Sequence, residues 1–461
     1  MLVGAVEQNA LQPTDDQAAA ELELATDAGL GGAIRVALTW ARGRKAPEPA
    51  NVIYVRNAID AAAKTRTTVY IALYPFGSSQ TPLSDNDQSD FTSWVTAIAR
   101  AVPAAKHFVI GNEPNLNRFW LPQFGPSGED VAAPAYVSLL AKTYDALKAI
   151  SPSIEVLGGA LSHAGVDKPN TGRDTHSPTV FIQDMGAAYR AIGRSAPIMD
   201  AFAFHPYMLR SDEPPTLTHT PPDTTITIAD YPRLVATLGQ AFDGTGQKGS
   251  TLPLVYTEFG VESQTPSDKA DLYTGSEPQT IHPVDEATQA QYYAQAMQLA
   301  FCQPNVKAFL LFSLVDETAH AGWQSGVYYA DGTPKSSLSA VRNAADAVRR
   351  NTIACPGLQV TPRVGVRWFP NGRPTTEPST FPISLVCDVD CTYRVQIERA
   401  ATHSAALTVK GKATGRILTK VEFPQSRLRP GAYRLTVWAQ ATTNIGPPAT
   451  ASGPVFVVPR V

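Results

Sequence analysis

Short runs of apolar and β-branched residues alternate with longer amphipathic stretches along most of the chain, up to about residue 350. This alternation is typical of repeated βα units, in which each buried strand is followed by a covering helix. The apolar runs predict strands at residues 2–6, 33–38, 68–73, 107–110, 154–158, 200–204, 254–257 and 308–312. The amphipathic stretches predict helices at residues 15–28, 52–64, 91–102, 135–150, 180–192, 231–242, 285–302 and 335–350. Eight elements of each kind predict a closed (β/α)8 TIM barrel, the α/β fold that we expect for residues 1–354.

An open, doubly wound α/β sheet is the alternative architecture for the same pattern. Nucleotide-binding sheets of that kind carry a glycine-rich turn after the first strand. This chain has Val6-Glu7-Gln8-Asn9 at that place, without a glycine. The closed barrel is therefore favoured.

The pattern changes after Cys355. Short alternating runs at residues 393–397, 406–409, 433–439 and 455–458 are separated by proline, glycine and asparagine turns. They predict a smaller all-β sandwich of the immunoglobulin or fibronectin type over residues 357–461. We expect its aromatic residues to fill its core and the domain to act as a spacer or stabilising accessory; they are Trp368, Phe369, Tyr393, Phe423, Tyr433, Trp438 and Phe456.

Composition narrows the classes of partner. The chain has 461 residues, of which 43% are hydrophobic and 17% charged, with a formal net charge of −3. Without a basic run or a positive overall field, nucleic acid is not expected as a partner. No apolar stretch approaches the roughly 20 residues that cross a bilayer, so we expect no membrane span. We expect the protein to be a monomer.

Four cysteines fall into two candidate pairs. Cys387 and Cys391 bracket a short turn, while Cys302 and Cys355 lie at or just after the ends of predicted helices. Two disulfides would indicate an oxidising compartment, and we expect a secreted protein whose signal peptide is absent from this chain. The alternatives are four free thiols, or a metal site at the close pair, although no second pair completes a zinc set.

Two glutamates, Glu113 and Glu258, follow the fourth and seventh predicted strands. In a (β/α)8 barrel the loops after the strands form the open face that carries catalytic groups. A single glutamate at such a place often caps a helix or is solvated. Two of them at the ends of non-adjacent strands indicate chemistry, because cleavage of a glycosidic bond needs two facing carboxyl groups.

The segments Gly111-Asn112-Glu113-Pro114 and Thr257-Glu258-Phe259-Gly260 resemble the catalytic motifs of clan A glycoside hydrolases, such as cellulase-like family 5 and family 39. His205-Pro206-Tyr207 after the sixth strand and Arg35 on the second strand extend the resemblance, which covers roughly residues 1–350. The resemblance implies a retaining glycosidase that acts on a carbohydrate or glycoside, with no metal and no cofactor. In it Glu113 is the general acid/base and Glu258 is the nucleophile.

The resemblance also implies roles for four neighbours. Asn112 would donate to the 2-hydroxyl of the sugar, and Arg35 and Tyr207 would hold Glu258 ionised through charge-assisted hydrogen bonds. His205 would contact the substrate or support a group that does. A structural ion pair for Arg35 and a core position for His205 stay open as alternatives.

Sugar sites also need aromatic faces. The candidates that follow predicted strands are Trp40, Tyr74, Phe119, Trp120, Trp323 and Tyr328. Many clan members carry a tryptophan at the end of strand eight, where this chain has Leu311-Phe312-Ser313-Leu314, so Trp323 is expected to replace it. Long loops at residues 115–133, 162–178, 208–229 and 262–283 would narrow the site, which favours exo action or small glycosides.

Two other functions remain open. The first is a catalytically silent carbohydrate-binding or cell-surface module on a glycosidase scaffold. The second is a (β/α)8 enzyme of other chemistry, such as an aldolase or a metal-dependent hydrolase. The second is disfavoured because the predicted strand ends carry no evident Schiff-base lysine and no cluster of His and Asp ligands.

Overall fold

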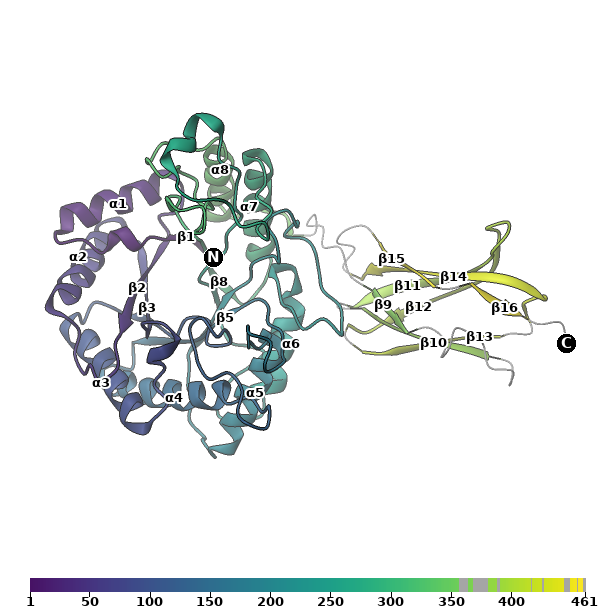
Figure 1. The fold of residues 1–461 in the computed structure, drawn as a ribbon, viewed down its shortest axis with the longest axis horizontal. Coiled ribbons are helices and arrows are strands. Elements are labelled where there is room, and N and C mark those ends of the chain that lie inside the picture. The colour runs from purple at the N-terminus through teal and green to yellow at the C-terminus, as the bar shows by residue number, and fades with distance from the viewer. Residues whose placement is uncertain are drawn as a thin grey trace. The chain divides into compact units, whose positions relative to one another are not determined.

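The computed structural model describes residues 1–355, 364–367, 380–387, 390–415, 417–424, 427–442, 448–453 and 455–458. The chain divides into two compact units, shown in Figure 1. The first contains Met1–Pro215 and Leu234–Ile353, and the second contains Thr216–Arg233 and Ala354–Val461.

A closed barrel of eight parallel strands forms the centre of the first unit in the described part of the chain. The strands are β1 (Leu2–Val6), β2 (Ala33–Trp40), β3 (Thr68–Pro75), β4 (His107–Ile110), β5 (Glu155–Ser162), β6 (Ala201–His205), β7 (Leu254–Tyr256) and β8 (Val306–Leu311). Gly4 of β1 pairs with Ala33 of β2, and Leu2 of β1 pairs with Ala308 of β8, which closes the ring. The predicted (β/α)8 fold is confirmed, and the open sheet is excluded.

The helices surround the strands in Figure 1. They are α1 (Asp15–Asp27), α2 (Pro49–Thr65), α3 (Asp85–Ala101), α4 (Ala132–Ile150), α5 (Pro178–Ala191), α6 (Tyr231–Phe242), α7 (Glu286–Phe301) and α8 (Leu338–Arg349). Helix α3 begins six residues before the predicted start at Phe91, because the Ser84 side chain accepts the Asp87 N–H and caps a polar first turn. Among the described residues, no helix has both the length and the apolar character needed to cross a membrane.

Small side chains fill the interior of the barrel. Ala33, Ala72, Ala203 and Ala308 belong to this core, and all four are fully buried. Successive residues of a strand point to opposite faces, so Arg35 and Ala37 of β2 lie on the same inward face as Ala33. Arg35 and Ala37 line the pocket at the end of the barrel where the strands finish. The small core residues therefore form the floor on which the polar site stands.

The second unit contains two antiparallel sheets, with strand orders β13-β10-β9 and β12-β11-β14-β15, and β16 pairs with β14. The strands are β9 (Val364–Arg367), β10 (Thr380–Cys387), β11 (Cys391–Arg399), β12 (Ala405–Ala413), β13 (Thr419–Pro424), β14 (Gly431–Ala441), β15 (Ala449–Ser452) and β16 (Phe456–Val458). Their core includes Leu385, Val395, Tyr433, Leu435 and Phe456, drawn from both sheets. The predicted all-β sandwich is confirmed. Trp368 and Phe369 lie outside the described residues.

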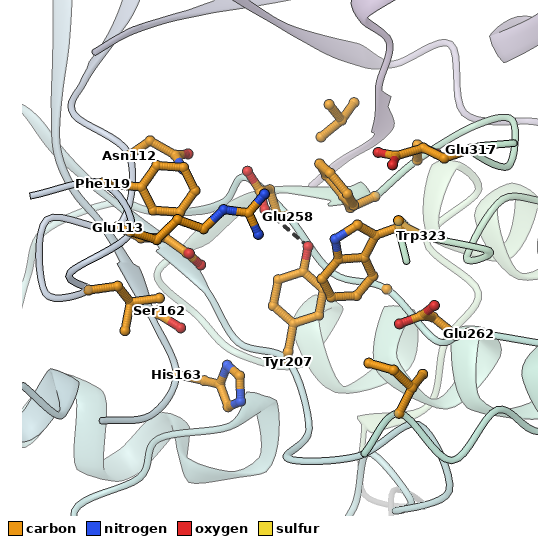
Figure 2. Close-up of a pocket in the computed structure, with 18 of the residues that line it drawn as sticks. Asn112, Glu113, Phe119, Ser162, His163, Tyr207, Glu258, Glu262, Glu317 and Trp323 are labelled. Carbon is orange, nitrogen blue, oxygen red and sulfur yellow. Dashed lines mark hydrogen bonds between the residues drawn. The ribbon is translucent and has the colours of Figure 1, made fainter. Parts of the chain in front are cut away.

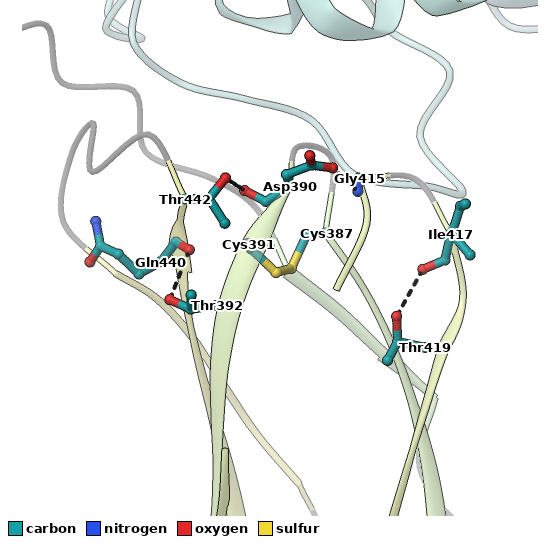
Figure 3. The surroundings of a disulfide bond; sticks show 9 residues. All are labelled: Cys387, Asp390, Cys391, Thr392, Gly415, Ile417, Thr419, Gln440 and Thr442. Carbon is teal, nitrogen blue, oxygen red and sulfur yellow. Dashed lines mark hydrogen bonds between the residues drawn. A yellow bond between two sulfur atoms is a disulfide. The ribbon is translucent and has the colours of Figure 1, made fainter. Parts of the chain in front are cut away.

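Disulfides account for every cysteine. Cys387 at the end of β10 is bonded to Cys391 at the start of β11, and Cys302 and Cys355 are also disulfide-bonded. Both the free-thiol interpretation and the metal interpretation of the close pair are wrong. Near the Cys387–Cys391 bond, Thr442 Oγ1 donates to the carbonyl oxygen of Asp390 at 3.1 Å, and the Gly415 N–H donates to its carboxylate at 2.7 Å (Figure 3).

Candidate active site

The structure brings Glu113 and Glu258 together at the open end of the barrel (Figure 2). Glu113 follows β4 and Glu258 follows β7. His205, the last residue of β6, is fully buried between them: its Nδ1 lies 3.0 Å from Glu113 Oε1 and 3.5 Å from Glu258 Oε2. One carboxylate oxygen from each glutamate and one ring nitrogen of His205 all lie within 4.8 Å of one another. The two carboxyl groups therefore face each other at short range.

A tight turn after β4 aims Glu113 into the pocket. Gly111 has φ 96°, and a β-carbon there would lie 2.9 Å from a ring carbon of Tyr136, so only glycine fits. Glu113 itself has φ 42°, in the left-handed backbone region that residues other than glycine rarely adopt. Its N–H donates to the carbonyl oxygen of Ala160 on β5 at 2.8 Å, which holds this conformation.

Asn115 ties the turn to the loop after β5. Its Nδ2 donates to the carbonyl oxygens of Ser162 and His176 at 3.2 and 2.9 Å, and its Oδ1 accepts the Ser162 N–H at 3.0 Å. The side chain is completely buried. Because Asn115 is only two residues from Glu113, this set of hydrogen bonds restricts the backbone that carries Glu113.

Glu258 receives a different donor on each oxygen. Arg35 Nη1 donates to Oε1 at 2.5 Å, and the Tyr207 hydroxyl donates to Oε2 at 3.0 Å. Burial and then the charges of Glu258 and Glu113 raise the pKa of Tyr207 well above its ordinary value, so the hydroxyl keeps its proton. Both donors therefore remain available across the physiological range, and they orient the Glu258 carboxylate.

Arg35 also reaches the residue before Glu113. Its Nη2 donates to Asn112 Oδ1 at 2.6 Å, while the arginine is only 3% exposed. Since the Asn112 oxygen is occupied, its amide nitrogen is the group that can address a ligand. Arg35 thus connects Glu258 with Asn112, so the ion pair that we considered as a structural alternative is itself part of the site.

The same cluster is the one place, among the residues that the structure describes, where three metal-ligating side chains converge: Glu113, His205 and Glu258. Both oxygens of Glu258 already accept hydrogen bonds from Arg35 and Tyr207. A cation bound there would also lie beside the Arg35 guanidinium, whose charge repels it. The donor set therefore suits proton transfer and nucleophilic attack better than metal binding.

Of the three predicted tryptophans, only Trp323 lies in the pocket. Its ring centroid is 5.2 Å from that of Tyr207 and 5.4 Å from that of Phe312, and Figure 2 shows it beside Tyr207 and Glu258. Tyr74 and Phe119 also line the pocket, with their rings 6.3 Å apart in an edge-to-face contact. The site therefore has aromatic surfaces, as its expected ligand requires.

Trp40 and Trp120 are not brought to the pocket, which corrects the sequence-based assignment. Trp40 is fully buried against Phe91 of α3, with ring centroids 5.6 Å apart, and its Nε1 donates to the carbonyl oxygen of Arg44. Trp120 is 1% exposed and packs edge-to-face on Tyr136 of α4, at 5.8 Å. Both rings fill the layer between strands and helices.

The pocket has a volume of about 1630 Å³, and Glu7 and Glu262 are among the buried carboxyl groups in its lining that the motifs did not reveal. Glu7 follows β1, and burial raises its pKa to about 7. Glu262 lies four residues after Glu258, and burial, followed by the charge of Glu277, raises its pKa to about 8. The rule that found Glu113, an acid just after a strand, would also have found Glu7.

Comparison with known proteins places the fold. No family model matches the sequence, and no curated protein matches it. Among solved structures, a family 39 glycoside hydrolase from the gut symbiont Bacteroides cellulosilyticus WH2 is 16% identical; the alignment covers 91% of this chain and 81% of that one, with a TM-score of 0.52. These values show that this chain shares the fold of that family 39 enzyme.

Two further solved structures align with lower scores. A family 39 enzyme from Xanthomonas axonopodis pv. citri is 15% identical over 92% of this chain and 91% of that one, with a TM-score of 0.47. A β-glucuronidase from Bacteroides uniformis is 12% identical over 100% of this chain, with a TM-score of 0.47. This chain spans about half the length of the glucuronidase, 46%.

Proposed function

We propose that this protein is a retaining glycoside hydrolase that cleaves O-glycosidic bonds by double displacement. One observation carries the proposal: carboxylate oxygens of Glu113 and Glu258 come within 4.8 Å of each other in a large open pocket. Retaining enzymes hold their two carboxyl groups about 5 Å apart, whereas inverting enzymes leave room for a water at roughly 6.5–9.5 Å. The short approach supports the retaining mechanism.

In the first step the Glu258 carboxylate attacks the anomeric carbon and forms a glycosyl ester, while protonated Glu113 gives its proton to the departing oxygen. In the second step Glu113, now a carboxylate, takes a proton from water, whose oxygen displaces Glu258 from the anomeric carbon. One proton leaves Glu113 and one returns, so the enzyme is restored. The product has the configuration of the substrate.

The neighbours of Glu258 act by positioning and by binding. Arg35 and Tyr207 hold the carboxylate toward the sugar, and the Asn112 amide nitrogen donates to the 2-hydroxyl as positive charge develops at the anomeric carbon. Their hydrogen bonds to Glu258 and to Asn112 Oδ1 support these roles. Trp323 offers a ring for the apolar face of a sugar.

The loops around the pocket support exo action on small glycosides. Residues of all four long loops line it, among them Arg118, Arg173, Arg210 and Ile281. Such walls shorten the space available beyond the cleaved bond. We also propose that the protein is secreted and monomeric; the disulfide-bonded cysteines support an oxidising compartment.

The test is a panel of aryl glycosides of both anomers with the wild type, Glu258→Ala and Glu113→Ala. We expect the wild type to hydrolyse at least one member and both variants to lose turnover. Added azide should rescue Glu258→Ala with a glycosyl azide of inverted configuration, and Glu113→Ala with one of retained configuration. Glu317→Gln, which changes an exposed carboxyl in the same pocket, is the matched control.

A Glu258→Ala variant as active as the wild type would refute the assignment of the nucleophile. Binding of glycosides to the wild-type pocket without hydrolysis of any panel member would support the alternative, a silent carbohydrate-binding module.

A further inference from the structure

The outer face of the sheet β12-β11-β14-β15 carries a hollow of about 470 Å³. It lies wholly within the second unit and is lined by Thr392, Tyr393, Arg394, Lys410, Gly411, Lys412, Trp438, Ala439, Gln440 and Pro448. Three of these residues are cationic and none is acidic.

Trp438 stands on this outer face instead of filling the core, which corrects the expectation for the accessory domain. Its neighbours on β14, Val437 and Ala439, are fully buried in the core. Side chains of a strand alternate between faces, so Trp438 must point the other way. A large aromatic ring is thus placed among charged residues.

The Arg394 guanidinium lies over the Trp438 ring, 4.1 Å from its centroid. In the sheet register Arg394 faces Trp438 on one side and Lys410 on the other, and Lys412 follows on the same face of β12. Arg394, Lys410 and Lys412 are exposed. Among the ion pairs of the described residues none involves these three cations. The nearest glutamate along β11, Glu398, instead accepts from Gln396.

This arrangement is suited to an anion. A guanidinium that is stacked on an indole ring loses little freedom when its planar fork meets a carboxylate or a sulfate. Lys410 and Lys412 are two residues apart on one face, roughly 7 Å, so that successive acidic groups of one ligand could meet them. Mutual repulsion of the three cations is relieved when such a ligand binds.

We propose that this hollow binds an anionic polysaccharide through the carboxylate or sulfate groups of its sugars. Nucleic acid fits less well, because binding of single strands relies on free aromatic faces for base stacking, and Arg394 covers this ring. The net charge of −3 also gives no general field for a phosphate backbone. The proposal does not depend on glycosidase activity.

Affinity electrophoresis of the full-length protein in native gels tests it, with polygalacturonate as the probe and its methyl ester as the uncharged polymer of the same backbone. We expect the carboxylate polymer to retard the wild type and the ester to leave it unretarded. Arg394→Gln and Lys410→Ala/Lys412→Ala should each raise the dissociation constant about tenfold. Lys420→Ala, which removes an exposed charge from β13 in the other sheet, should leave it unchanged.

Dextran sulfate in parallel gels separates sulfate from carboxylate as the bound group, with plain dextran as its control. Circular dichroism and melting of each variant show that the domain is folded. The proposal is overturned by equal retardation in polygalacturonate and its ester, by unchanged affinity of the folded Arg394→Gln protein, or by stronger binding to a single-stranded oligonucleotide than to either anionic polymer.

Discussion

At the residue scale, the Glu258 carboxylate has one donor on each oxygen, and these donors are not equivalent. Arg35 supplies a charge, whereas Tyr207 supplies a neutral hydroxyl that stays protonated because burial raises its pKa. Removal of the hydroxyl leaves the ring, its packing on Trp323 and the Arg35 contact in place.

Tyr207→Phe should therefore lower kcat/KM for an aryl glycoside by roughly 10–100-fold. A hydrogen bond to a charged group contributes about 1.5–3 kcal/mol, and each 1.4 kcal/mol is about a tenfold change in rate. Steady-state kinetics of the wild type and Tyr207→Phe measure this loss in kcat/KM. Tyr189→Phe is the control, since that hydroxyl donates to the carbonyl oxygen of Ala196 and does not line the pocket. Equal losses in the two variants would contradict a specific role for Tyr207.

Glu262 predicts a pH dependence of stability. Burial, with the nearby charges of Glu277 and Asp316, raises its folded-state pKa to about 8 from 4.5. Between these values the folded protein holds a proton that the unfolded chain has lost. The free energy of unfolding therefore falls as pH rises, by up to about 1.4 kcal/mol per pH unit, and this contribution is complete only below pH 4.5.

Glu262→Gln removes the titratable carboxyl of Glu262. The free energy of unfolding should then decline less steeply between about pH 5 and pH 8. Urea unfolding of both proteins at pH 5.5 and 7.5 measures the difference. Glu23→Gln, which changes an exposed carboxyl on α1 away from the pocket, should keep the wild-type slope. If Glu262→Gln also kept the wild-type slope, Glu262 would not be the group that causes the pH dependence of stability.

Single residues also mark the limit of what the sequence could predict. The two motif glutamates, Glu113 and Glu258, were placed correctly after strand ends, because hydrophobic runs locate those ends. Trp40 was misplaced although it ends a strand, since it lies five positions after Arg35 and so faces outward. Trp120 lies in a loop, where side chains do not alternate regularly and the sequence therefore does not predict which way each one points.

At the scale of elements, the loops after β4 and β5 act as one support for Glu113. Asn115 joins them with three hydrogen bonds from a completely buried side chain. No motif signals this contact, because its partners Ser162 and His176 are 47 and 61 residues away. The strands were predicted well because burial produces a regular pattern of apolar residues in the sequence. The conformation of these loops depends instead on hydrogen bonds between residues that are far apart in the sequence.

Asn115→Ala should lower the free energy of unfolding by roughly 2–4 kcal/mol, since it leaves buried backbone groups without partners. It should also lower kcat, because the turn that carries Glu113 loses its support. Urea unfolding and steady-state kinetics measure the two effects. Asn305 lies just before β8, and its side chain donates to the carbonyl oxygen of Ser250. Asn305→Ala loses this one hydrogen bond and should affect stability alone. A full kcat in folded Asn115→Ala protein would disprove the positioning role.

At the scale of the whole molecule, the chain consists of two units with separate cores, one inside the barrel and one between the two sheets. All residues that line the proposed active site belong to the first unit. The Cys387–Cys391 disulfide belongs to the second, and both cysteines are buried in its core.

A Cys387→Ala/Cys391→Ala variant should lose about 2 kcal/mol of stability in the second unit, the value expected for a loop of about five residues. Turnover of an aryl glycoside at 25 °C should stay at the wild-type level. Calorimetry of the full-length protein and kinetics test the two parts. A loss of turnover in the folded variant would show that the active site depends on the second unit.

The central claim is that Glu258 forms a covalent bond to the sugar while Glu113 moves the proton. A 2-deoxy-2-fluoro glycoside of the sugar identified in the panel tests it most directly, because the fluorine slows breakdown of the intermediate. Intact-mass and peptide mass spectrometry should find one glycosyl group per chain, on the peptide that contains Glu258, and none in Glu258→Gln. An adduct on another residue, or continued hydrolysis to an inverted product without an adduct, would contradict the account.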